Sequence, residues 1–308
     1  MKISVVGSGG VGGYFGGMLA RAGHEVLFVA RGGHLDAIRS SGLKIIRDSE
    51  EFTVYPDATN EPLTDGYSDL VLFTVKTYDS ELAMGLLGGL VGESTRILTL
   101  QNGVDSYRGL EDVFGVERVL AGAAYLESRV DSPGVIKQTG NIVRIVFGRS
   151  DGAVTPETTG IELEFNKAGI PTELTSTIKE TLWSKFIFIA AVAGVSAACR
   201  TRLGVLMKNN GYQRLLVGTM KEIEQVARHQ GICLDKDIVG QTMAYVTKSV
   251  RDIMASMHLD LERGRKLELE ALSGTVVRMG KKAGLETPLN ETIYLVLKPF
   301  VEGREVGA

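Results

Sequence analysis

The spacing of apolar residues divides this chain of 308 residues into two halves. Before about residue 176, short apolar runs alternate with segments of helical periodicity, which is typical of an α/β domain built on a parallel sheet. From Ile178 onward the pattern is helical only. A chain of this length exceeds one ordinary core. We therefore expect an α/β domain at residues 1–176 and an all-α domain at 177–308, closely packed with a cleft between them.

The same patterns predict the individual elements. The apolar runs expected as parallel strands are residues 3–6, 26–30, 69–75, 96–100 and 119–123. Looser patterns indicate an inserted hairpin or extra strands at 43–46 and 52–55, and further strands at 124–130, 134–138, 142–148 and 171–174. The helices expected beyond the first are 34–41, 79–90, 105–114, 156–168, 178–199, 203–207, 210–230, 235–255, 262–283 and 288–301.

A glycine-rich turn joins the first apolar run to a stretch of small residues. In this strand–turn–helix context, Gly-x-Gly-x-x-Gly is the fingerprint of a dinucleotide-binding βαβ unit. Gly7 allows the sharp turn, Gly9 lets the backbone approach a pyrophosphate, and Gly12 allows close packing of helix and strand. Free N–H groups at the helix start would hold the phosphates. Unless this is only an ordinary tight turn, the cofactor-binding residues here are Gly7, Ser8, Gly9, Gly10, Val11 and Gly12.

Arg31 refines the prediction of the cofactor. The second apolar run ends at Val29-Ala30-Arg31 without an acidic residue. An acid there usually binds the ribose 2′-OH of NAD, whereas an arginine accommodates the 2′-phosphate of NADP. The sequence therefore favours NADP, and the alternative is a solvated surface arginine.

Composition excludes several classes of function. The formal net charge is −3, without the basic excess of nucleic-acid-binding proteins. Two cysteines predict neither a disulfide framework nor a cysteine metal site. The first strand starts too close to Met1 for a signal peptide. The apolar run Phe186–Cys199, fourteen residues long, suits a buried helix better than a membrane span. We expect a cytoplasmic protein with no nucleic-acid or membrane partner.

Three polar residues lie at the ends of the predicted apolar strands and of the apolar helical run: Lys76, Asn102 and Lys185. Ligands of open α/β sheets bind outside the carboxyl ends of the strands, so Lys76 and Asn102 are expected on the rim that carries the glycine loop. Lys185 precedes the apolar run at Phe186, where a charge is costly unless it faces a cleft. Desolvation lowers the pKa of a lysine, which can then protonate a carbonyl oxygen as hydride arrives. The alternative is a lysine that snorkels from a core helix.

The amphipathic segment Leu261–Lys282 carries one more candidate. Glu268 by itself is one more solvated helix charge. Ser256 precedes it by twelve residues, which is about 18 Å along a straight helix. The chain must therefore bend if both side chains touch one small ligand, and Asp260 is the expected cap of a new helix at that bend.

Taken together, these motifs resemble the ketopantoate reductase (2-dehydropantoate 2-reductase) family along the full length of the chain. The resemblance implies a Rossmann-type domain followed by an all-α domain like that of 6-phosphogluconate dehydrogenase. The motifs in family order are the glycine loop, Ala30-Arg31-Gly32 with His34-Leu35, Thr74-Val75-Lys76, Gln101-Asn102-Gly103, Trp183-x-Lys185, Ser256-Met257 and Glu268.

The resemblance also implies an activity: NADPH-dependent reduction of a 2-keto acid to a 2-hydroxy acid, in the pathway toward pantothenate and coenzyme A. It makes Lys185 the general acid at the keto oxygen, and Glu268 a residue that hydrogen-bonds the substrate hydroxyl or orients Lys185. Asn102 would lie beside nicotinamide and substrate. Ser256 would reach the substrate carboxylate, and Lys76 would lie near the cofactor ribose and the reacting centre.

Two features depart from the family pattern. The family usually has Asn four and eight positions after its lysine, on the same helical face, where this chain has Ile189 and Ala193. Ser273-Gly274 replaces a common Asn-Gly. The expected pocket is less polar, which leaves open a related NADPH-dependent reductase of another 2-keto acid. A non-catalytic NADP-binding sensor is a third alternative, with no need for Lys185 and Glu268 in one cleft. A homodimer is left open.

Overall fold

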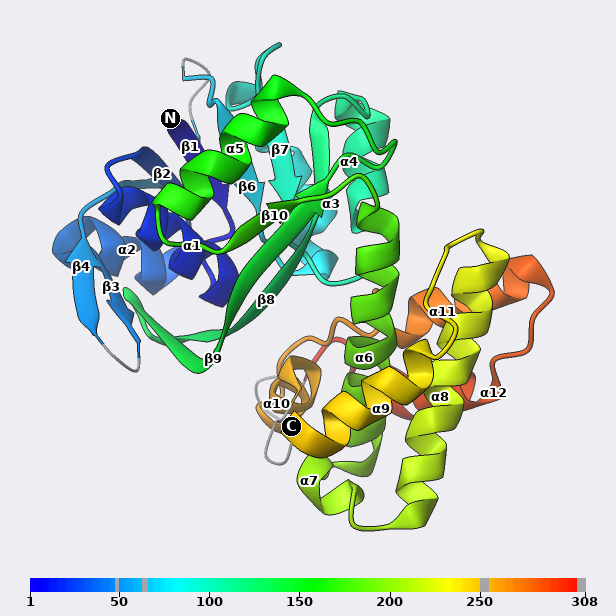
Figure 1. The fold of residues 1–308 in the computed structure, drawn as a ribbon. Coiled ribbons are helices and arrows are strands. Elements are labelled where there is room, and N and C mark those ends of the chain that lie inside the picture. Colours follow the sequence, from blue (N-terminus) through cyan, green and yellow to red (C-terminus); the bar gives the residue numbers. More distant parts are fainter. Residues whose placement is uncertain (48–49, 63–65, 250–254, 304–308) are drawn as a thin grey trace. The chain divides into compact units, whose positions relative to one another are not determined.

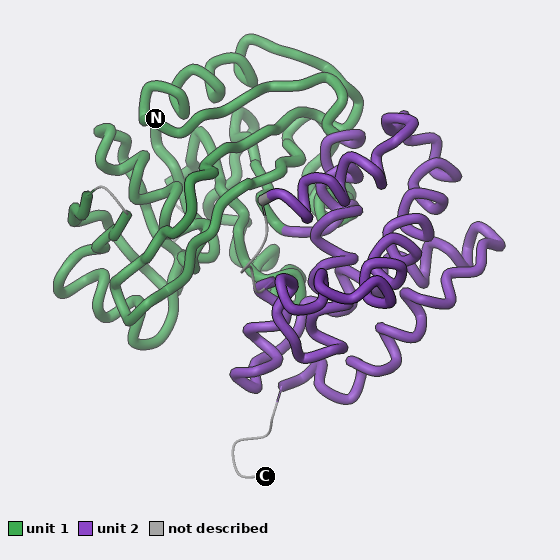
Figure 2. The backbone as a smooth tube through the Cα atoms, turned by 60° about the horizontal axis from the view of Figure 1, so that its bottom comes forward, with its two compact units in different colours: residues 1–101, 105–178 green, residues 102–104, 179–308 purple. Residues whose placement is uncertain are grey.

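The structure, a computed structural model, describes residues 1–47, 50–62, 66–249 and 255–303. It has two compact units: Met1–Gln101 with Asp105–Ile178, and Asn102–Val104 with Lys179–Ala308 (Figure 2). The α/β and all-α fold classes are confirmed. The roles expected for residues 1–176 and 177–308, which are cofactor binding and substrate binding, stay predictions. So does the cleft between the two halves.

The first unit is a ten-stranded sheet with helices packed on it (Figure 1). Its strand order is β4-β3-β9-β8-β7-β6-β1-β2-β5, with β10 paired to β9. From β8 to β5 the neighbouring strands run parallel, and β6 is buried along its whole length, as expected for a strand covered on both faces. The strands are β1 Lys2–Val6, β2 Glu25–Val29, β3 Leu43–Ile46, β4 Glu51–Val54, β5 Asp57–Thr59, β6 Leu70–Phe73, β7 Arg96–Thr99, β8 Val119–Ser132, β9 Val135–Gly148 and β10 Thr172–Leu174.

The antiparallel part of the sheet is more continuous than predicted. β8 and β9 are two long strands, where shorter separate segments were expected. The expected break at Gly140 is a bulge, because Leu126 pairs with Val143 whereas Glu127 pairs with Thr139. Gly140 has φ +77°, so β9 absorbs the extra residues and continues. The edge strand β5 was not predicted, since three residues are too few to show a period.

The helices of the first unit follow the prediction except at 79–90. That single helix is wrong: the chain forms the 3₁₀ turn η1, a short helix α3 and a second turn η2. Glycine is about 1 kcal/mol less favourable than alanine inside a helix, and Gly85, Gly88 and Gly89 interrupt this segment. The helical elements here are α1 Gly10–Arg21, α2 Gly32–Ser41, η1 Thr77–Asp79, α3 Ser80–Met84, η2 Leu87–Gly89, α4 Ser106–Phe114 and α5 Pro156–Lys167.

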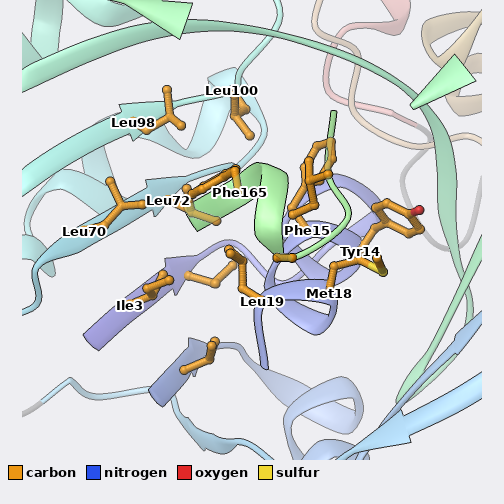
Figure 3. Packing of buried hydrophobic residues seen from close by; sticks show 14 of the residues in the cluster. Ile3, Tyr14, Phe15, Met18, Leu19, Leu70, Leu72, Leu98, Leu100 and Phe165 are labelled. Carbon is orange, nitrogen blue, oxygen red and sulfur yellow. The ribbon is translucent and has the colours of Figure 1, made fainter. Parts of the chain in front are cut away.

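The core of the first unit forms where α1 packs on the parallel strands. Tyr14 and Phe15 of α1 are fully buried in this cluster, which Figure 3 shows with strand residues such as Leu72. α1 approaches the sheet closely at Gly16, where an added Cβ would lie 2.6 Å from the Phe28 ring. The small residues of α1 therefore allow this helix to pack closely on the sheet.

Every regular element in the described part of the second unit is helical. α6 is the helix predicted at 178–199. The prediction at 235–255 extends over residues 250–254, which lie outside the described residues. The elements are α6 Ile178–Cys199, α7 Leu203–Leu206, α8 Asn210–His229, α9 Ile238–Ser249, α10 Ser256–Glu262, α11 Ser273–Ala283, α12 Pro288–Leu297 and η3 Lys298–Phe300.

The continuous helix predicted at 262–283 is wrong. α10 ends at Glu262, and an irregular segment leads to α11. α10 stops at Glu262 because Gly264 takes the left-handed conformation that commonly ends a helix, with φ +64°. The chain does bend, but Asp260 does not cap a new helix: it lies within α10, and its carbonyl accepts the Arg265 N–H at 2.8 Å.

α6 is the one helix among the described residues that is long and apolar enough to cross a membrane. Of its most apolar window, 67% is buried inside the protein. The prediction of a buried core helix is therefore confirmed.

Glu222 of α8 caps the start of α12. Its two carboxylate oxygens accept the backbone N–H groups of Leu289 and Asn290, each at 2.9 Å. The Asn290 side-chain amide also donates to Glu222 at 2.7 Å. The first N–H groups of a helix lack intrahelical partners, and Thr287 makes no side-chain cap here. α8 therefore satisfies the donors at the start of α12.

Glu222→Gln should destabilise the protein by about 2 kcal/mol, because an amide removes the charge and turns a donor toward N–H groups. Chemical denaturation measures this change in the free energy of unfolding. Glu224→Gln is the matched control on α8, where an i,i+4 pair with Arg228 is lost and the cost should stay below about 0.5 kcal/mol. Equal effects of the two substitutions would contradict the capping role.

Candidate active site

The glycine loop of the first unit leaves open space above its backbone. Gly7 has φ +100°, and an added Cβ would lie 2.6 Å from the Val75 nitrogen. A Cβ on Gly12 would lie 2.2 Å from the Gly7 carbonyl oxygen, whereas one on Gly9 would meet nothing within 4 Å. α1 starts at Gly10 without a side-chain cap. Gly9 thus leaves space beside the loop backbone, and the first N–H groups of α1 have no intrahelical partners, which fits a pyrophosphate.

The side chains of Thr74 and His34, which the sequence indicated only as members of longer motifs, hold this loop. Thr74 Oγ1 donates to the Gly7 carbonyl at 2.7 Å. His34 Nε2 donates to the Ser8 carbonyl at 2.8 Å, and its Nδ1 accepts the Gly134 N–H at 3.0 Å. These two bonds require the neutral ring, and burial lowers the pKa of His34 in agreement. The sequence signal that could have indicated this role is the position of Thr74 and His34 just after apolar strand segments, whose carboxyl ends meet the glycine loop.

Arg31 lies between β2 and α2, at the N-cap position of α2. Its guanidinium Nη2 lies 2.5 Å from Asp79 Oδ2, in an ion pair that the sequence did not reveal. Lys76 is the N-cap residue of η1 and is half-buried. The first unit therefore brings Arg31 and the 76–79 turn together at the carboxyl ends of β2 and β6.

In the second unit, the ammonium group of Lys185 is the central feature. Lys185 lies in α6 and is half-buried, and its Nζ donates to Asn102 Oδ1 at 3.1 Å. Desolvation lowers the pKa of Lys185 to about 8, although the nearby charge of Glu268 acts in the opposite direction. A lysine with this pKa exchanges its proton close to neutral pH.

The structure also brings Glu268 to this group. Glu268 is 7% exposed and lies in the irregular segment between α10 and α11, not on a solvated helix face. Lys185, Asn102 and Glu268 thus form one cluster within the second unit. Ser256 is exposed at the first position of α10, and its predicted contact with a substrate carboxylate stays a prediction.

The α6 face beyond Lys185 is apolar. Ile189 lies one turn further along and is half-buried, and Ala193 follows one turn later at 4% exposure. Helix positions four apart share a face. The charged cluster around Lys185 is therefore followed along α6 by an aliphatic face.

Comparison with known proteins agrees with this geometry. Residues 3–152 match the family model described as ketopantoate reductase PanE/ApbA, and residues 177–301 match that of its C-terminal part. A PanE/ApbA family ketopantoate reductase from Ralstonia eutropha JMP134 is 31% identical, with a TM-score of 0.90 and coverage of 97% of this chain and 98% of that one.

Two further proteins are similar along their whole length. The uncharacterized oxidoreductase YkpB of Bacillus subtilis is 28% identical, over 97% of this chain and 99% of that protein. D-mandelate dehydrogenase, solved with NADH and anilino(oxo)acetate, is 21% identical with a TM-score of 0.89, over 97% of this chain and 98% of that one. At this identity, the similarity to D-mandelate dehydrogenase shows a shared fold and nothing more.

Lys185→Met should change how stability depends on pH. The unfolded chain keeps the lysine proton up to about pH 10.5, whereas the folded protein releases it near pH 8. Between these values the unfolded state binds more protons, so the wild type should gain about 2–3 kcal/mol relative to Lys185→Met from pH 7 to pH 10. Denaturation curves at both pH values measure this gain. Lys208→Met, at an exposed lysine, is the control. An equal pH dependence in wild type and Lys185→Met would contradict desolvation of the ammonium group.

Proposed function

Since the chain belongs to the ketopantoate reductase PanE/ApbA family, we propose that it reduces a 2-keto acid to a 2-hydroxy acid with NADPH. The leading substrate is 2-dehydropantoate (ketopantoate), which would place the protein in pantothenate and coenzyme A synthesis in the cytoplasm. The observation that carries the proposal is the desolvated Lys185, bonded to Asn102 and influenced by Glu268. A protein that only binds a nucleotide has no need of such a group.

The reaction needs a hydride at the keto carbon and a proton at the keto oxygen. NADPH supplies the hydride when it is bound. Lys185 would donate a hydrogen bond to the keto oxygen and then its proton as negative charge develops there. Its ammonium group stabilises charge that appears only in the transition state. Its pKa of about 8 makes it a stronger acid than an ordinary lysine and leaves it mostly protonated at neutral pH.

The neighbouring groups would keep the Lys185 amine protonated and would restrict the direction of its N–H bonds. The carboxylate of Glu268 favours the protonated amine and could accept a hydrogen bond from a substrate hydroxyl. Asn102 accepts from the ammonium group and restricts its direction. Ser256 would bind the substrate carboxylate. For the cofactor we assign the glycine loop to the pyrophosphate, Arg31 to the 2′-phosphate and Lys76 to the ribose.

A second candidate is reduction of a more apolar 2-keto acid. Ile189 and Ala193 continue from Lys185 along α6 and offer no hydrogen bond to a hydroxylated substrate chain. A site that lacks hydrogen-bonding groups discriminates weakly between similar aliphatic chains. The same catalytic cluster could therefore serve a keto acid with an unsubstituted alkyl group.

Lys185→Ala should lower kcat/KM for keto acid reduction by about 10²–10⁴-fold while NADPH still binds, because one positioned acid and its charge are lost. Lys185→Arg keeps a charge that does not titrate, so it separates electrostatic stabilisation from proton donation. The wild-type rate should fall above pH 8, and the Lys185→Arg rate should not. NADPH oxidation measures both, with Lys208→Ala as the control. Full activity in Lys185→Ala would refute the assigned role.

Ile189→Asn should shift substrate preference toward ketopantoate by about tenfold, since it adds a hydrogen-bonding group one turn from Lys185. The measurement is kcat/KM for ketopantoate and for 2-keto acids with plain alkyl chains, in wild type and variant. Ile189→Leu is the control for size. A wild-type preference for ketopantoate that Ile189→Asn leaves unchanged would exclude the apolar alternative.

A further inference from the structure

The ion pair between Arg31 and Asp79 joins the carboxyl ends of two strands of the first unit. Arg31 follows β2, and Asp79 ends the η1 turn that follows β6. Although the Arg31 side chain is 72% exposed, its guanidinium group forms an ion pair with Asp79. The Asp79 side chain is 29% exposed and the two charged atoms are 2.5 Å apart.

Asp79 is held in place by its own turn. Its backbone N–H donates to the Lys76 carbonyl at 2.9 Å. On either side, the buried side-chain amide of Gln101 donates to the Val75 carbonyl at 2.9 Å and to Ser80 Oγ at 2.7 Å. Asp79 therefore lies on a turn held by hydrogen bonds, whereas Arg31 is the longer and more exposed partner of the pair.

We propose that Asp79 is a specificity-determining residue that reduces the preference of this site for NADPH over NADH. The proposal rests on the cofactor assignment made above. An arginine at the end of the second strand accommodates a 2′-phosphate, whereas an acidic residue at that same place accepts the ribose 2′-OH. This chain supplies both groups at one corner, the arginine from the β2 end and the carboxylate from the β6 end.

The charges determine the direction of the effect. A 2′-phosphate must draw Arg31 from Asp79 or approach the carboxylate, and like charges at such distances repel. A ribose 2′-OH meets no such cost, because it can donate to Asp79 while Arg31 stays paired. The acid therefore opposes NADPH and supports NADH, so the two cofactors bind with more similar affinity than Arg31 alone would allow.

Asp79→Asn tests this inference by direct binding. Calorimetric titration with NADPH and NADH should show the ratio of their affinities rising about tenfold in favour of NADPH, as the repulsion disappears and Arg31 is released. 2′-AMP should gain affinity as NADPH does, and 5′-AMP should not. Arg31→Ala should move the ratio the opposite way. Glu81→Gln removes one charge from the same segment at an exposed position and should leave the ratio unchanged.

The outcomes separate this inference from the proposed function. If Asp79→Asn changes the affinities for both cofactors equally, or weakens NADPH, the role of Asp79 is refuted whatever the enzyme activity. If the ratio moves as expected but wild type oxidises no NADPH with any keto acid, the reductase proposal fails and the inference stands. If the wild type binds neither dinucleotide, both are refuted.

Discussion

The second unit depends on the compensation of one desolvated ammonium group. Removing the charge of Lys185 from water is unfavourable unless an acceptor and an opposite charge replace the solvent. Asn102 supplies the acceptor and Glu268 supplies the charge, and neither belongs to α6. The irregular segment before α11 is what buries Glu268. Glu268 is thereby buried where its charge favours the protonated amine of Lys185.

Sequence reasoning succeeded where the determinant is local. The glycine pattern predicted the fold of the first strand–turn–helix unit, and the structure shows that Gly7 and Gly12 also make room for residues 74–75 after β6. The limits of α6 agree with the prediction because an apolar run with no glycine or proline near its start leaves few alternatives. The desolvation expected for Lys185 followed from its place in that helix, and its catalytic role stays a prediction.

Sequence reasoning failed where a residue's interaction partner lies far away in the chain. The burial of Glu268 depends on the folded unit and could not be seen from its helix-forming neighbours. The end of α10 was a local signal that the prediction overlooked, because Gly264 takes φ +64° there. Nothing near Arg31 in sequence indicates that Asp79 pairs with it, because β6 lies beside β1 only in the finished sheet. Gly140 was expected to end a strand, yet a bulge lets the chain continue.

The imidazole of His34 links folding order to the glycine loop. It bonds to Ser8 near the N-terminus and to Gly134, a hundred residues downstream of His34 itself. During synthesis the first βαβ segment leaves the ribosome long before the β8–β9 hairpin exists. The loop must therefore wait for a distant contact of high sequence separation before its geometry is complete. A nascent chain can acquire its first helix early, yet the His34 bond to Gly134 forms only once the turn between β8 and β9 exists.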